Sequence, residues 1–395
     1  MSPFDPLFQV LSMIGIILKY AWWIILPCGL YSIFRPVWKS YVTNINFFGT
    51  EIQMTLLKIS LPKDMESKPK SMENVLGGLL GTGRTITYYQ NLMFGRMNDY
   101  FSFEIVGSEG DVSFYILTTK RSIRLVEKLI YGQFPDVEIT VGVEDYFNRI
   151  PATVPDDNWD MWGAKMIFTK PDCLPITSYR QFEDPMTGDL FDPLASILES
   201  MGTLGPGEHL IYQIQIAVPD GDWRKKGEAE IERILQMYNM SPMADMSEGG
   251  AMMRVLPHHQ QEYLKSIHYK MDKPAWVCQL LYVYIARKEV FSPVGSSAIG
   301  GSLRMFESGN NNTFTTDKYY TASAYQFMRK TRQHYRKRRL LKLMQERDMQ
   351  GELQTLNTEE LATLWHFPTQ LTKVPSIPRL ESRRSPAPFN LPVGE

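Results

Sequence analysis

Apolar and polar residues alternate along several stretches of this chain with the two-residue period of β-strands. Such stretches cover residues 51–61, 100–106, 112–118 and 137–143. Apolar residues with helical spacing occupy residues 71–80 and 119–134. Since the two middle strands are joined by Gly107-Ser-Glu-Gly110, they form a hairpin. The order strand, helix, hairpin, helix, strand predicts a ferredoxin-like (split βαβ) sandwich over residues 46–150.

A similar order follows residue 150. Strands are expected at residues 163–169, 209–218 and 276–287, and helices at residues 193–204 and 298–306. A charged segment, residues 219–275, interrupts this order and contains two further helical stretches. We therefore predict an α+β chain in which a second ferredoxin-like domain, residues 151–315, carries a helical insertion.

The N-terminal segment is apolar from residue 7 to residue 34 except for Lys19 and a few small or weakly polar residues. This length is sufficient to cross a hydrocarbon core of roughly 30 Å. A lysine within the span costs about 2.5 to 3.5 kcal/mol, which the many large apolar residues offset. We expect a transmembrane helix within an anchor of residues 1–45. The alternative is a membrane-surface or re-entrant hairpin bent near Pro27.

The flanking charges predict the orientation of this anchor. Asp5 precedes the apolar run, whereas Arg35 and Lys39 follow it. The positive-inside rule therefore predicts a single-pass protein of the cytoplasmic (inner) membrane, with its C-terminal bulk in the cytoplasm. Three widely separated cysteines without a CxxC pair fit a reducing compartment and argue against a disulfide scaffold or a zinc site.

Residues 316–350 contain a basic stretch. Although the whole chain has a net charge of -1, residues 329–347 carry nine Lys or Arg and one Glu. We expect a helix with a cationic face that contacts DNA phosphates or anionic lipid. A merely solvated face is the alternative. The candidate contact residues are Arg329, Lys330, Arg332, Arg336, Lys337, Arg338, Arg339 and Lys342.

Residues 351–395 combine a short helix with a proline-rich tail. Asn357 and Glu360 have the spacing of a capping box, and Pro368 limits the helix at its other end. The apolar face of this helix predicts a docking site for a partner protein. The candidate docking residues are Leu361, Leu364, Trp365 and Phe367.

Residues 78–85 nearly match the phosphate-binding loop GxxxxGK[ST]. That loop must follow a strand and open a helix, whereas here a helix precedes it and a strand-like run, residues 86–90, follows. Arg84 also replaces the lysine. We therefore expect a helix C-terminus, and the sequence predicts no catalytic residue, no metal ligand and no cofactor.

Several sequence blocks resemble the N-terminal, non-ATPase region of membrane-associated conjugation and type IV secretion ATPases. The blocks are residues 69–75, 101–106, 112–116, 130–136, 143–146, 284–291, 297–301 and 356–368. In that family an ATPase domain follows this region, and we expect none in this chain.

This resemblance implies a non-enzymatic membrane component of a conjugation-like or type IV secretion/pilus machine. The component would act as a cytoplasmic assembly platform for a separately encoded FtsK/HerA-like secretion ATPase. DNA and a second copy of the chain are further candidate partners. The alternative function is a membrane-tethered nucleic-acid-binding protein that uses the basic helix, residues 329–347.

Overall fold

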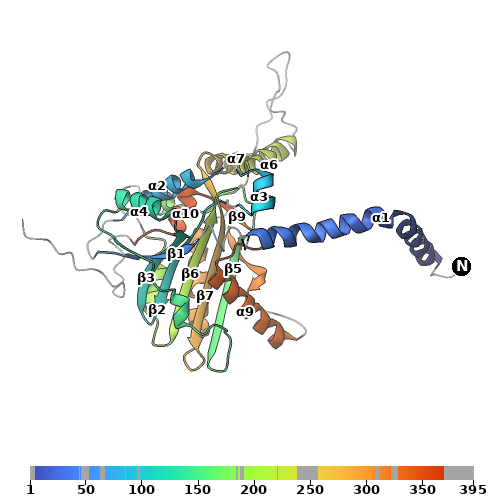
Figure 1. Ribbon diagram of the computed structural model, residues 1–395. Coiled ribbons are helices and arrows are strands. Elements are labelled where there is room, and N and C mark those ends of the chain that lie inside the picture. The colour runs from blue at the N-terminus through green and yellow to red at the C-terminus, as the bar shows by residue number, and fades with distance from the viewer. Residues whose placement is uncertain are drawn as a thin grey trace, which may run out of the picture. The chain divides into compact units, whose positions relative to one another are not determined.

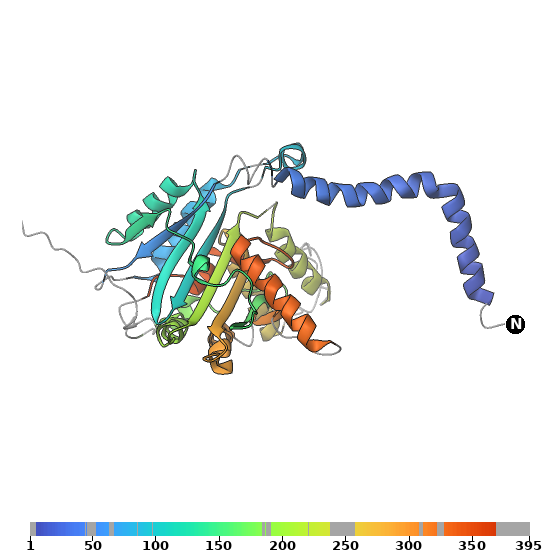
Figure 2. The same ribbon diagram turned by 60° about the horizontal axis from the view of Figure 1, so that its bottom comes forward.

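The computed structural model describes two compact units. Its described residues are 5–43, 45, 53–62, 67–84, 86–96, 98–183, 186, 191–219, 221–237, 257–307, 311–321 and 328–368. One unit contains residues 1–53 and 84–98, and the other contains residues 54–83 and 99–395. Figures 1 and 2 show that the chain is α+β, as predicted.

An antiparallel sheet of nine strands forms the centre of the second unit. The strands are β1 (Met54–Ser60), β2 (Tyr100–Ser108), β3 (Asp111–Thr119), β4 (Glu138–Val141), β5 (Trp159–Phe168), β6 (Glu208–Ala217), β7 (Ala275–Arg287), β8 (Phe314–Thr321) and β9 (Gln354–Asn357). Their order is β4-β1-β3-β2-β6-β7-β5-β8, and β9 pairs with β7. Each pairing is antiparallel.

Helices connect the strands of this sheet. They are α2 (Pro69–Leu79), α4 (Ile123–Gln133), α5 (Ala195–Gly202), α6 (Arg224–Met237), α7 (His258–Met271), α8 (Pro293–Ser302), α9 (Arg329–Glu346) and α10 (Thr358–Leu364). The path β1-α2-β2-β3-α4-β4 gives the strand order β4-β1-β3-β2. The second half repeats this order as β8-β5-β7-β6, with α6 and α7 inserted between β6 and β7.

The two halves share one sheet. Strands β2 and β6 pair along their whole length, from Tyr100 with Ala217 to Ser108 with His209. The predicted boundary after residue 150 therefore does not separate two domains. The boundary after residue 315 falls within β8, so residues 316–321 also belong to the sheet.

Each face of the sheet has its own core. Along β6, Leu210, Tyr212 and Ile214 belong to the cluster that contains side chains of α2, α4, α5, α8 and α10. We call this side the first face. Ile211 belongs instead to the cluster that contains buried leucines of α9, which lies on the second face. Figure 2 shows α9 across that face of the strands.

The first unit contains two helices, α1 (Asp5–Val42) and α3 (Tyr88–Phe94). The expected strand at residues 86–90 is wrong, because the side chains of Thr87 and Gln90 form a capping box that begins α3. Helix α1 includes Pro27 and is not interrupted there, although Figure 2 shows a sharp bend within the helix. Within the part of the chain that the structure describes, no helix combines the length and apolar character needed to cross a membrane.

Candidate functional site

Helix α9 is anchored to the sheet by its C-terminal half. Its buried side chains on the second face are Leu340, Leu341, Leu343 and Met344. Gly163 of β5 permits this close packing, since a Cβ atom there would lie 3.1 Å from Leu340 Cδ2 and 2.4 Å from the carbonyl oxygen of Tyr282. A glycine inside a strand often marks such a close approach.

Arg347, directly after α9, is buried rather than part of the basic surface. Its Nε atom donates a hydrogen bond of 2.8 Å to Glu104, and its Nη1 atom lies 2.5 Å from Asp145 Oδ2. Burial alone would lower the pKa of Arg347, but Glu104 and neighbouring groups raise it overall. The sequence expectation counted Arg347 among the cations of the helix, and the structure corrects this.

A row of buried polar side chains crosses the second face beneath the end of α9. The row consists of Glu104 on β2, Gln213 and Gln215 on β6, Gln279 on β7 and Lys165 on β5. Successive members are joined by hydrogen bonds of 2.8, 3.0, 3.4 and 2.9 Å. We call these five side chains the polar row.

The polar row also holds the chain that follows α9. Gln213 donates to the carbonyl oxygen of Met344, Gln279 donates to that of Asp348, and Lys165 donates to that of Gln350. Buried polar groups must find partners inside the protein, so these bonds favour one position of the helix end over others. The apolar contacts and the polar row together fix α9.

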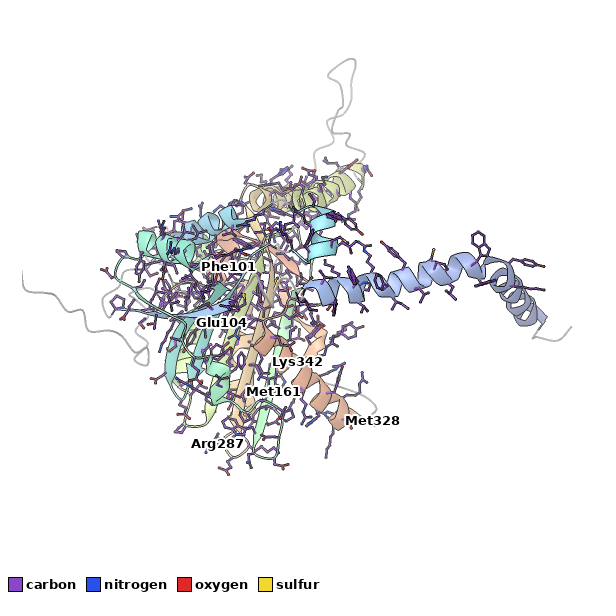
Figure 3. The ribbon with its side chains drawn as sticks, in the orientation of Figure 1. Phe101, Glu104, Met161, Arg287, Met328 and Lys342 are labelled. Atoms are coloured by element: carbon purple, nitrogen blue, oxygen red, sulfur yellow. The ribbon has the colours of Figure 1, made fainter. Side chains whose placement is uncertain are left out.

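The N-terminal end of α9 presents cations to solvent (Figure 3). The exposed Lys and Arg residues of α9 whose side chains have neither an acidic partner within 4.0 Å nor a contact with an aromatic side chain, among the residues that the structure describes, are Arg329, Lys330, Arg332 and Arg338. We call these four residues the open cations. Tyr335, which lies between them in sequence, is also exposed.

The other four predicted contact residues differ from the open cations. Lys337 lies 2.5 Å from Asp160, and the exposed Lys342 lies 3.6 Å from Glu346. The guanidinium of Arg339 lies 4.3 Å from the ring centroid of Tyr320 and donates to its hydroxyl over 2.7 Å. Arg336 is half-buried. The basic surface therefore contains fewer exposed, unpaired cations than the eight that the sequence predicted.

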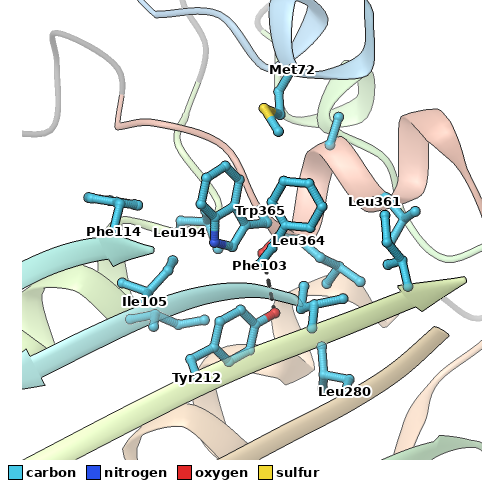
Figure 4. Packing of buried hydrophobic residues seen from close by; sticks show 14 of the residues in the cluster. Met72, Phe103, Ile105, Phe114, Leu194, Tyr212, Leu280, Leu361, Leu364 and Trp365 are labelled. Carbon is cyan, nitrogen blue, oxygen red and sulfur yellow. Dashed lines mark hydrogen bonds between the residues drawn. The ribbon is translucent and has the colours of Figure 1, made fainter. Parts of the chain in front are cut away.

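The predicted docking residues lie in the chain's own core. Leu361, Leu364, Trp365 and Phe367 are at most 2% exposed. The Trp365 ring packs edge-to-face against Phe103 and Phe114, with centroids 5.0 and 5.8 Å away. Figure 4 shows this packing, together with the hydrogen bond of 3.2 Å from the Tyr212 hydroxyl to the Leu364 carbonyl oxygen. These side chains are not available to a partner in this structure.

The polar side of α10 is also satisfied internally. Its predicted capping box is confirmed, since Asn357 and Glu360 each accept from the other's backbone N–H. Glu360 lies 3.4 Å from the fully buried Lys270, and Glu359 pairs with Lys273. All seven residues of α10 are buried. The docking prediction is therefore corrected: this helix fills the core of its own chain.

The glycine-rich segment after α2 has a packing role. Helix α2 ends at Leu79 and continues as a 3₁₀ turn, so the expected helix C-terminus is confirmed. A Cβ atom at Gly78 would lie 2.6 Å from Leu129 Cδ2 of α4. Gly78 thus permits the close approach of α2 and α4. A phosphate-binding loop would follow a strand, whereas this segment follows α2 and forms a 3₁₀ turn at Leu80–Thr82.

No protein-family model matches this chain, and neither a curated protein nor a solved structure is significantly similar to it. The resemblance to the secretion ATPase region therefore stays a prediction. The function must be argued from the geometry of the described residues.

Proposed function

We propose that the sheet unit binds nucleic acid through α9, and that the chain is a membrane-associated, non-enzymatic component of a conjugation-like or type IV secretion machine. The observation that carries the proposal is the contrast within α9. The open cations face solvent, while buried side chains near the C-terminus of the same helix fix it to the sheet. A fixed helix presents its charges without an ordering cost on binding.

The side chains on this surface favour binding of nucleic acid over a helix face that is merely solvated. The guanidinium group can donate two parallel hydrogen bonds to a phosphate, and three of the four open cations are arginines. Tyr335 on α9 and Tyr319 on the adjacent β8 are exposed aromatic side chains suited to stacking on bases. An anionic lipid surface is the competing ligand.

Two further parts of the proposal come from the sequence. The apolar run within residues 7–34 and the aromatic side chains exposed on α1, such as Trp22 and Trp23, support membrane association. The resemblance supports an assembly platform with a separately encoded ATPase as partner. Any surface for that ATPase must lie outside the buried side chains of α10.

The test is DNA binding by the full chain in detergent, measured by fluorescence anisotropy at several salt concentrations. The double variant Arg332→Gln/Arg338→Gln should weaken binding and reduce the salt slope by about two phosphate contacts. The matched control, Arg124→Gln/Lys128→Gln, removes the same charge from exposed positions of α4.

The control separates a local site from a general effect of charge. Equal weakening in both double variants, or binding without salt dependence, would overturn the assignment of α9. If vesicles containing phosphatidylglycerol displace the DNA from the original chain but not from the double variant, α9 is a lipid-binding helix instead.

A further inference from the structure

The first compact unit carries an aromatic surface that the nucleic-acid proposal does not use. This surface begins with α3, which is held in place at both ends. Thr87 accepts from the Gln90 backbone N–H over 3.3 Å, and Gln90 accepts from that of Thr87 over 3.2 Å. Gly95 ends the helix in the left-handed region at a φ of +62°.

Two contacts attach α3 to the end of α1. The indole N–H of Trp38 donates to the carbonyl oxygen of Leu92 over 3.2 Å. A Cβ atom at Gly95 would lie 2.6 Å from the Cα atom of Thr43, so the two backbones touch here. Helix α3 is therefore a fixed part of this unit, and its exposed side chains are held on a defined surface.

That surface is apolar and aromatic. On α3, Tyr88, Tyr89, Met93 and Phe94 are between 43% and 61% exposed. On α1, Phe34, Val37 and Tyr41 are also exposed. Soluble monomers rarely leave a large group of apolar side chains in water, and such groups mark protein or membrane contacts.

The charges of the unit favour a membrane. Residues 19–43 and 84–98 contain five Lys or Arg and no Asp or Glu. Arg35 lies 5.4 Å from the ring centroid of Tyr88, and Arg96 lies 6.0 Å from that of Phe94. Cations beside aromatic rings are typical of the boundary between lipid headgroups and acyl chains.

We infer that α3 and residues 34–41 of α1 form an interfacial site for an anionic lipid surface. The tyrosine and phenylalanine rings would enter the boundary between headgroups and acyl chains, and Arg35, Lys39 and Arg96 would face lipid phosphates. This inference rests on the proposed membrane association and adds a second, peripheral contact to it.

The test places a fluorescent probe on α3 in the full chain. Cys28 is exposed and is replaced by serine, whereas Cys173 and Cys278 are buried. Tyr89→Cys is then labelled with a polarity-sensitive NBD group, and the protein is reconstituted into vesicles containing phosphatidylglycerol. We expect blue-shifted emission and stronger quenching by a headgroup spin label than by a label at the acyl terminus.

Two controls make the result specific. Val141→Cys places the same probe on the exposed edge strand β4 and should keep water-like emission. Gly95→Val should separate α3 from α1 and abolish the blue shift at position 89. Phe94→Cys provides a second labelling position on α3 if the probe at position 89 disturbs the helix.

The outcomes separate this inference from the function on which it rests. If the chain does not float with vesicles, the membrane part of the proposed function fails. If it floats but the probes on α3 remain water-like, only the interfacial site fails. An equal blue shift in vesicles of phosphatidylcholine alone would overturn the recognition of anionic lipid.

Discussion

Helices α9 and α10 lie close together in sequence, and both were expected to contact partners, yet the structure uses them differently. Helix α9 buries one half and leaves four cations open to solvent. Helix α10 buries all seven residues. An apolar face shows that a helix is covered, but not whether its own chain or another chain covers it. Polar residues without internal partners are the better guide to an open surface.

The largest loss of stability should follow a substitution in the core around α10. Trp365→Ala should lower the free energy of unfolding by about 3 to 5 kcal/mol, because it leaves a cavity between Phe103 and Phe114. Urea denaturation followed by circular dichroism measures this. Trp365→Phe should cost less, since the indole N–H has no hydrogen-bond partner among the described residues. A loss below about 1 kcal/mol for Trp365→Ala would favour a docking role after all.

The second largest loss of stability should come from the ion pair of Arg347, which holds the end of α9. Arg347→Met should destabilise the protein by about 3 kcal/mol, because Glu104 would remain buried without its cation. Adding Glu104→Gln should restore part of the loss. The same denaturation experiment on the single and double variants gives the coupling energy. Independent, additive losses would contradict a direct pairing of these two side chains.

A smaller effect on stability is expected from Lys165. Burial lowers the pKa of this side chain to about 8. Above pH 8 the folded protein releases this proton while the unfolded chain, with a pKa near 10.5, keeps it. The contribution of Lys165 to the unfolding free energy should therefore rise from pH 8 to pH 9 by about 1 kcal/mol. In the same window the buried thiols of Cys173 and Cys278 act in the opposite direction, because burial raises their pKa values and only the unfolded chain loses these protons.

Lys165→Met provides the comparison for this pH dependence. The unfolding free energy of the original chain minus that of the variant should rise by about 1 kcal/mol between pH 8 and pH 9, since the thiols contribute equally to both proteins. Parallel curves for the two proteins would show that Lys165 does not change its protonation on folding in that range.

The smallest effect on stability should come from the open cations. Arg332→Gln/Arg338→Gln should change the unfolding free energy by less than about 0.5 kcal/mol, because neither side chain is buried or ion-paired in the described part of the chain. Thermal unfolding of this variant measures the change. A loss comparable to that of Arg347→Met would mean that the exposed half of α9 has a structural role.

The local pattern predicted most strands and helices of the sheet unit, because each has a clear apolar period. Their assembly into one sheet could not be predicted, since the pairing of β2 with β6 depends on residues more than a hundred positions apart. Strand β8 was missed because its polar residues, such as Thr316 and Lys318, give weak alternation at the sheet edge. Helix α3 was mistaken for a strand because capping outweighed the β-propensity of Tyr88 and Tyr89.

The sequence predicted the position of helix α9 but not the contacts of its side chains. Residue types identified α9 as basic, yet they could not show that Arg347 turns inward to Glu104. The polar row had a sequence signal that could have been used: Gln213 and Gln215 stand two residues apart in a strand whose other residues from position 210 to 217 are apolar or aromatic. Two amides on one face of a buried strand require partners, and these partners hold the end of α9.

The late position of β9 and α10 in the chain has a consequence for biosynthesis. Trp365 and Phe367 complete the apolar cluster of the first face, to which strands as early as β1 contribute. Until residue 367 has left the ribosome, Phe103 and Phe114 lack these two aromatic neighbours. Most of the strands are therefore synthesised before this part of the core can form. The nascent chain therefore leaves the part of this apolar face that α10 covers exposed until late in its synthesis, which is the kind of surface that chaperones bind and that promotes aggregation.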